Sequence, residues 1–185
     1  MPINGTLAEA YLRNRGLNLP LPDCLRFASL PYGRTGPEHP VLVAAIASAE
    51  GRLVAIQRTY LAADGKGKAS VPKPKLSLGR VSGGAVRLGD CARSLMICEG
   101  LEDGLTLMQE MGRSVWVSAG AGNLHKMQFP PGVEAVAIGG DNDATGQAEA
   151  RKAADAFALR GMEARCFFPL PDFKDFNQEL QERAR

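Results

Sequence analysis

Apolar and polar residues alternate in blocks along the second half of the chain. Short apolar runs, which predict buried strands, are separated by amphipathic or alanine-rich segments, which predict helices. The predicted strands are residues 95–98, 114–117, 133–138 and 162–168. The predicted helices are residues 102–111, 124–127, 144–159 and 176–183. Strands and helices in this order predict an α/β fold, a Rossmann-like, largely parallel four-stranded sheet with flanking helices.

The first half has a different pattern, without a regular alternation of strands and helices. Residues 7–15 have the spacing of a helix that ends at Gly16, a favourable residue after a helix C-terminus. Residues 41–47 and 53–61 predict a β-hairpin. We therefore expect a small α+β subdomain at residues 1–93, followed by the α/β domain at residues 94–185.

The same half ends in less regular sequence. Residues 64–68 are rich in glycine and residues 71–75 contain two prolines, so both are expected to be loops. Residues 83–88 predict one more strand. This part of the chain carries the basic run Lys66, Lys68, Lys73, Lys75 and Arg80, which is either a solvated face or a surface for nucleic acid.

Composition excludes several classes of protein. The chain has 185 residues, of which 45% are hydrophobic, enough for one large or two small domains with a buried core. No apolar run approaches the roughly 20 residues that cross a bilayer, and the N-terminus lacks the apolar stretch of a signal peptide. The four cysteines have neither zinc-site nor disulfide-framework spacing. We expect a cytoplasmic protein with no membrane contact.

Charge is distributed unevenly between the two halves. The net charge is +2, but residues 1–94 carry +7 and residues 95–185 carry −5. Such a division suits a protein that binds a polyanion with one part and a metal ion with the other. Two ordinary solvated faces would also produce it, so charge alone does not decide between the two interpretations.

Three acidic motifs follow three of the predicted strands. They are Glu99-Gly100-Leu101-Glu102-Asp103, Asp141-Asn142-Asp143 and Lys174-Asp175-Phe176-Asn177. Because ligands of an open α/β sheet bind beyond the carboxyl ends of its strands, these carboxylates are expected at one edge. Crowded carboxylates repel one another, and a divalent cation with oxygen ligands relieves the repulsion. The pattern predicts a Mg²⁺ site that acts on phosphates.

Each motif also has a purely structural interpretation. Glu102 lies in the first turn of a predicted helix, where the helix dipole favours acids, and we interpret it in this way. Asp143 is positioned to cap the helix that follows it. An EF-hand is excluded, because the twelfth residue counted from Asp141 is Lys152 rather than glutamate.

The three motifs, in this order, resemble the TOPRIM domain of bacterial-type primases, topoisomerases and some nucleases, over residues 95–185. The first half resembles the basic N-terminal subdomain of the primase RNA-polymerase core. The stretches that carry this second resemblance include Arg15-Gly16-Leu17, Leu25-Arg26-Phe27, Gly51-Arg52-Leu53-Val54-Ala55 and Pro74-Lys75-Leu76-Ser77. The whole is most similar to TOPRIM primase-like proteins of phages, plasmids and integrated elements.

The resemblance implies a role for each matching residue. Glu99 is expected to be a metal ligand or proton-transfer group, and Asp141 and Asp143 to hold Mg²⁺ or Mn²⁺. Asp103 and Asp175 are expected beside that metal. Two metals there would activate a primer 3′ hydroxyl and stabilise the departing pyrophosphate. The residues expected to bind nucleic acid or nucleotide are Arg58, Lys73, Lys75, Arg87, Lys174 and Asn177.

The resemblance therefore implies a primase-type nucleotidyltransferase that uses single-stranded DNA and nucleoside triphosphates. The sequence departs from the family at Asn177, where many primases have an acid. It also lacks a zinc-ribbon module and a helicase, so a partner chain or missing segment is expected to supply these functions. The alternatives are a TOPRIM nuclease, in which the same metals activate water, and a nucleic-acid-binding module whose catalytic site has decayed.

Overall fold

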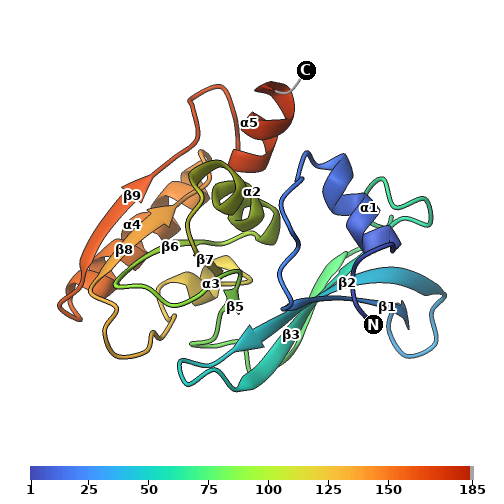
Figure 1. The fold of residues 1–185 in the computed structure, drawn as a ribbon, viewed down its shortest axis with the longest axis horizontal. Coiled ribbons are helices and arrows are strands. Elements are labelled where there is room, and N and C mark those ends of the chain that lie inside the picture. The colour runs from blue at the N-terminus through green and yellow to red at the C-terminus, as the bar shows by residue number, and fades with distance from the viewer. Residues whose placement is uncertain (184–185) are drawn as a thin grey trace.

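The computed structural model describes residues 1–183 and contains two β-sheets that lie side by side (Figure 1). The first sheet is antiparallel with the strand order β1-β2-β3-β4, and helix α1 packs against its β1 and β2 strands. The elements of this half are α1 (Leu7–Asn14), β1 (Leu25–Pro31), β2 (Glu38–Ala47), β3 (Leu53–Tyr60) and β4 (Lys75–Gly79). No helix in the described residues is long and apolar enough to span a membrane.

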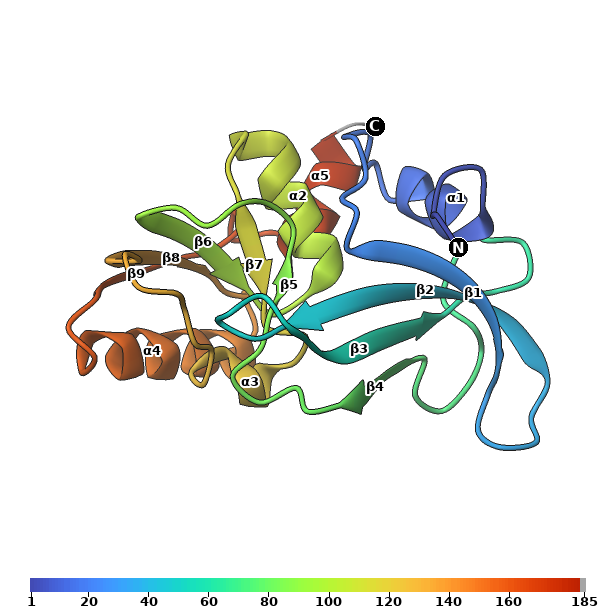
Figure 2. The same cartoon turned by 60° about the horizontal axis from the view of Figure 1, so that its bottom comes forward.

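The second sheet has five strands in the order β5-β7-β6-β8-β9. Its strands are β5 (Val86–Arg87), β6 (Ser94–Cys98), β7 (Val115–Val117), β8 (Ala135–Gly139) and β9 (Glu163–Phe167). Its helices are α2 (Leu101–Met111), α3 (Ala121–Leu124), α4 (Ala144–Ala158) and α5 (Phe176–Arg183). Helices α2 and α5 lie on one face of this sheet, and α3 and α4 lie on the other (Figure 2).

The predicted α/β fold is confirmed, with one correction to the strand number. The four predicted strands pair in parallel as β7-β6-β8-β9. A fifth strand, β5, adds to β7 in antiparallel orientation through Val86–Val117 and Arg87–Trp116. Residues 83–88, which we expected to belong to the first half, thus contribute to the second sheet.

The first half also contains strands that the sequence pattern did not predict. The hairpin of β2 and β3 is as expected, but β1 and β4 add to its two sides. Strand β1 contains no clean alternation of apolar and polar residues, and β4 directly follows Pro72 and Pro74. Both are outer strands, which depend less on local propensity than on pairing with a strand already in place.

A continuous hydrophobic core joins the two halves. It contains Tyr11 and Leu12 of α1 and Leu42 of β2, together with Leu105 of α2 and Val117 of β7. A second core, under α4, is built around Trp116, Ile138 and Phe157. The first core crosses from one sheet to the other, so burial of apolar surface holds the two halves together.

Close packing of α2 on its sheet depends on a glycine. A Cβ atom at Gly104 would collide with the side chain of Val117 and crowd Leu88 and Cys98. The absence of a side chain lets the helix lie close to β6 and β7. This approach places the N-terminal turn of α2 over the end of β6, where the first acidic motif lies.

Candidate active site

The acidic motifs meet where the strand order of the second sheet reverses. Strands β6 and β8 are neighbours, with Cys98 paired to Gly139 at their carboxyl ends. The chain leaves β6 through α2 on one face and leaves β8 through α4 on the other (Figure 2). Such a switch point leaves a crevice beyond the strand ends, which is the usual ligand site of this architecture.

A cavity of about 240 Å³ lies in this crevice. Five carboxylates line it: Glu99 follows β6, Glu102 and Asp103 lie in the first turn of α2, Asp141 follows β8, and Asp175 lies just before α5. The cavity is also lined by basic side chains, namely Arg15, Lys68, Lys75 and Lys174. Residues from both halves of the chain therefore form it.

The carboxylates affect one another strongly. Burial, followed by repulsion from Asp175, raises the pKa of Asp103 to about 7. Burial, followed by repulsion from Glu99 and Asp175, raises the pKa of Asp141 to about 6. These shifts show that the four side chains share one electrostatic environment, which favours the binding of a cation.

The loop that carries Asp175 is attached to the end of β8 by Asn142. Its side-chain amide donates hydrogen bonds to the carbonyl oxygens of Pro169, Leu170 and Phe173, at 2.8 to 3.0 Å. Its backbone N–H also donates to the carbonyl of Lys174 at 2.8 Å. No motif in the sequence predicts a role for Asn142. Its position between two aspartates at a strand end was the only signal available.

Asp143 does not line the cavity. Its carboxylate accepts a hydrogen bond from the Gly146 N–H at 2.8 Å and caps α4, as the structural interpretation of the sequence predicts. This hydrogen bond is the main reason that the pKa of Asp143 is lowered. Lys174 contributes to the same effect, because its Nζ lies 3.7 Å from Oδ2 of Asp143. The side chain is exposed, so its expected role as a metal ligand stays a prediction.

Two substitutions separate the capping role of Asp143 from a role in catalysis. We expect Asp143→Ala to lower the free energy of unfolding, because the cap is lost. Asparagine caps helices as well as aspartate does, so Asp143→Asn should melt like the wild type. Thermal melts and Mg²⁺-dependent activity are measured for both variants. Activity lost in Asp143→Asn at unchanged stability would show a metal role, and wild-type activity would exclude one.

Glu102 lies in the first turn of α2, as the sequence predicts, but it is buried and paired with residues of the first half. It is 5% exposed and accepts a hydrogen bond from the Tyr11 hydroxyl at 2.7 Å. The Nζ atoms of Lys75 and Lys68 lie 2.7 and 3.4 Å from its carboxylate oxygens. Burial by itself would raise the pKa of Glu102, but Lys75 and Lys68 hold it well below its usual range.

The two lysines differ in how strongly they are paired. Burial opposes the charge of Lys75, but Glu102 outweighs this effect and raises the pKa of Lys75. At Lys68 burial is the larger effect and lowers the pKa, because its contact with Glu102 is longer. Both side chains remain about one third exposed, at 31% and 32%, so they face the cavity rather than being sealed in the core.

Asn177 is buried, with 1% exposure, and its side chain is fully engaged. It donates to the carbonyl of Arg15 and to the Thr106 hydroxyl, and it accepts from the Arg15 guanidinium at 3.0 Å. Its backbone N–H donates to Asp103 at 3.0 Å. Asn177 thus links α1 to α2 and orients Asp103, which is closer to a structural than to a nucleotide-binding position.

Three other predicted binding residues lie outside the cavity. Arg58 neighbours Thr59 in β3, and Thr59 pairs with Lys75, so Arg58 and Lys75 lie on opposite faces of the first sheet. Lys73 is exposed in the loop before β4. Arg87 stacks over the Trp116 ring at 4.1 Å and donates hydrogen bonds to the carbonyls of Ser48 and Ala49.

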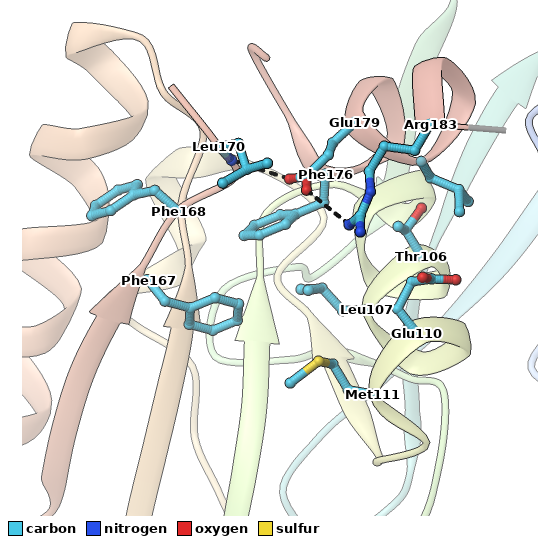
Figure 3. Close-up of a pocket in the computed structure, with 11 residues that line it drawn as sticks. Thr106, Leu107, Glu110, Met111, Phe167, Phe168, Leu170, Phe176, Glu179 and Arg183 are labelled. Atoms are coloured by element: carbon cyan, nitrogen blue, oxygen red, sulfur yellow. Dashed lines mark hydrogen bonds and ion pairs between the residues drawn. The ribbon is translucent and has the colours of Figure 1, made fainter. Parts of the chain in front are cut away.

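A second cavity, of about 290 Å³, is apolar and separate from the carboxylates. It lies between α2, β9 and α5, where Leu107, Met111, Phe167 and Phe176 face one another (Figure 3). Its charged residues are at the rim, where Arg183 pairs with Glu179 at 3.2 Å. This cavity lacks the converging carboxylates of the first and is not the candidate active site.

Comparison with known proteins identifies the second half. Residues 94–185 match the family model described as "Toprim domain". This half of the chain is a TOPRIM domain. Residues 1–88 match a domain of unknown function, DUF7146. No curated protein matches the sequence.

The TOPRIM domain and the first half together have the fold of DnaG-type primase cores. One similar structure is the primase fragment of the bacteriophage T7 primase-helicase protein, with a TM-score of 0.61, 19% identity and 95% of this chain covered. For the DnaG catalytic core these values are 0.63, 16% and 96%. For the Aquifex aeolicus primase with its zinc-binding and RNA polymerase domains they are 0.61, 16% and 97%. The chain spans 66%, 69% and 53% of these three structures.

Proposed function

We propose that this chain is a Mg²⁺-dependent, primase-type nucleotidyltransferase core that extends primers on single-stranded DNA. The observation that carries the proposal is the cavity at the strand ends, where five carboxylates and four basic side chains from both halves meet. Carboxylates suit a divalent cation, and ammonium and guanidinium groups suit phosphates. A nucleoside triphosphate with its bound metal ion carries both a divalent cation for the carboxylates and phosphates for the basic side chains.

The donor set fits Mg²⁺. In the described residues, no three acidic, histidine or cysteine side chains are close enough to bind one ion together. Mg²⁺ does not require such a cage, because it usually keeps several waters and binds one or two carboxylates together with substrate phosphates. We propose that one or two of Asp141, Glu99 and Asp103 would hold it directly, with Asp175 and Asp143 nearby. Mg²⁺ there would neutralise the charge that develops on the reacting phosphates.

The remaining residues have roles that follow from their positions. Lys75 and Lys68 would bind phosphate oxygens on the N-terminal side of the cavity, and Lys174 would do so at its C-terminal side. Arg15, held by Asn177, would add a further cation at the junction of the two halves. We propose that Arg58 and Lys73, outside the cavity, contact the template strand or are solvated. Arg87 has a structural role in this arrangement.

The similar structures also suggest partners. One of them belongs to a protein named a primase-helicase, and another includes a zinc-binding domain. We propose that this chain likewise works with a helicase or a zinc-binding module, on another chain or segment, which would select the template.

Primer synthesis tests the proposed function directly. The protein is incubated with single-stranded DNA, labelled nucleoside triphosphates, and Mg²⁺ or Mn²⁺, with a preformed primer in a parallel reaction. We expect metal-dependent extension of the primer that stops when EDTA is added. Metal-dependent shortening of the DNA without synthesis would instead identify a nuclease. DNA binding with neither reaction would identify a module without catalytic function.

A further inference from the structure

Glu102 connects three separate segments beside the candidate active site. It belongs to α2 of the TOPRIM domain, while Tyr11 is in α1, Lys68 in the loop after β3, and Lys75 at the start of β4. The Tyr11 hydroxyl donates to Oε1 at 2.7 Å, and Lys75 donates to Oε2 at 2.7 Å. One carboxylate therefore holds two lysines of the other half in fixed positions.

The lysines keep donors for a ligand. An ammonium group has three N–H donors, and the contact with Glu102 occupies one of them on each lysine. Each lysine thus has donors left after its contact with Glu102. Both side chains are about one third exposed and line the cavity that contains Glu99, Asp103 and Asp141.

Stability alone does not explain this arrangement. A buried ion pair costs a desolvation penalty that its attraction often fails to exceed, and apolar side chains in its place are frequently as stable. The pairing does, however, restrict two flexible side chains that otherwise have large rotamer entropy. A ligand that meets lysines already restricted in this way avoids part of the ordering cost.

We propose that Glu102 is a positioning residue that holds Lys68 and Lys75 ready to bind the triphosphate chain of an incoming nucleotide. The inference rests on the proposed function and deepens it, since it assigns the phosphate-binding side of the cavity. Glu102 itself does not contact the substrate. It acts through the two lysines.

Glu102 has two conceivable effects on phosphate binding, neutralisation of the lysines and positioning of the lysines. They predict opposite changes in phosphate affinity when Glu102 is removed. If the carboxylate only neutralised the lysines, its removal would increase the positive charge and tighten phosphate binding. If it positions them, removal leaves two ammonium groups that repel each other and move into solvent, and binding weakens. The direction of the change in affinity separates the two roles.

Glu102→Gln is the main test, because glutamine keeps the size of the side chain and can accept the Tyr11 hydrogen bond. Binding of inorganic tripolyphosphate and of ATP, each with Mg²⁺, is measured by isothermal titration calorimetry. We expect both ligands to bind about tenfold more weakly, because a change of this size corresponds to the loss of roughly one charge-assisted hydrogen bond. Glu110→Gln, the same change at an exposed position of α2 outside this cavity, should bind like the wild type.

Two further measurements exclude a general structural effect. Mn²⁺ affinity in the absence of phosphate, followed by electron paramagnetic resonance, should be unchanged in Glu102→Gln. In primer extension the KM for nucleotide should rise while kcat stays within about twofold. In a Lys68→Ala/Lys75→Ala background, Glu102→Gln should have no additional effect on tripolyphosphate affinity, because the residues through which it acts are absent.

The outcomes distinguish this inference from the proposed function. If the wild type binds tripolyphosphate and Glu102→Gln binds it equally or more tightly, the positioning role is wrong and the proposed function stands. If the wild type binds neither tripolyphosphate nor ATP, the phosphate site and the proposed function both fail. Should Glu102→Gln not fold, Tyr11→Phe removes only the hydroxyl that holds the carboxylate. We expect it to weaken tripolyphosphate binding about threefold, and unchanged binding would overturn the inference.

Discussion

Replacing Asp141 with asparagine is expected to reduce Mg²⁺-dependent nucleotide transfer by about a thousandfold, the scale of losing a group that stabilises transition-state charge. Asp141 lies at the carboxyl end of β8, at the switch point of the sheet, and its pKa is raised to about 6 by burial and by Glu99 and Asp175. Asparagine keeps the shape of the side chain but removes the charge that would hold the cation.

The matched control is Asp172→Asn, an exposed aspartate in the loop before α5 that lies outside the cavity. It should retain full activity. The metal-free Asp141→Asn protein should melt at the wild-type temperature or higher, because one repelling carboxylate is gone. Rates are measured by primer extension under saturating nucleotide. Activity within a few fold of wild type would show that the metal site does not depend on Asp141.

The second large effect concerns the stability of the metal-free protein, which is expected to fall as the pH rises from about 5 to about 7. Asp103 has a pKa of about 7 and Asp141 of about 6, against an ordinary value of 3.8. In this range the folded chain binds more protons than the unfolded chain, so raising the pH favours unfolding.

The other groups with shifted pKa values, Glu102 and His125, do not reverse this trend between pH 5 and pH 7. The lowered pKa of Glu102 contributes stability that is lost only as the pH falls below its ordinary value of 4.5. The pKa of His125 is lowered, chiefly by burial, so its contribution to stability rises with pH and opposes the trend. This opposition is weak, because the ring lies near the surface. We expect a net loss of about 2 to 4 kcal/mol, discounted for the partial exposure of Asp141.

The measurement is a series of thermal melts in EDTA between pH 5 and 7.5, repeated with saturating Mg²⁺. A loss of this size lowers Tm by roughly 5 to 15 °C. Mg²⁺ should recover most of it at pH 7.5 and little at pH 5, because it binds the ionised carboxylates of the folded protein. Asp103→Asn should flatten the pH dependence. A Tm that stays level or rises between pH 5 and 7.5 in EDTA would contradict the crowding of these carboxylates.

Much of the second half was predictable because its signals are local. The apolar runs that became β6, β7, β8 and β9 are short and separated by clear helical segments, and β6 and β7 are buried on both faces. Once the strands are parallel, their carboxyl ends share an edge, so Glu99 and Asp141 had to approach one another. Glu99, Asp103, Asp141 and Asp175 do line one cavity.

The first half was less predictable because its strands depend on their neighbours. β1 and β4 are outer strands of weak pattern, stabilised by pairing with β2 and β3. Register then decides which side chains share a face. Lys75 pairs with Thr59, one residue from Arg58, so two basic residues that look equivalent in the sequence point to opposite sides of the sheet.

The residue types at the strand ends, together with the order of strands and helices, were sufficient to determine a TOPRIM-like sheet with an acidic edge. Tertiary structure alone decided that Asn177 is buried against Arg15 and that Glu102 holds Lys68 and Lys75. The reason is physical. Strand formation and edge position follow from hydrophobic periodicity within short segments. The contacts of Glu102 with Tyr11, Lys68 and Lys75 join residues 27 or more positions apart, and they form only when packing brings the two halves together.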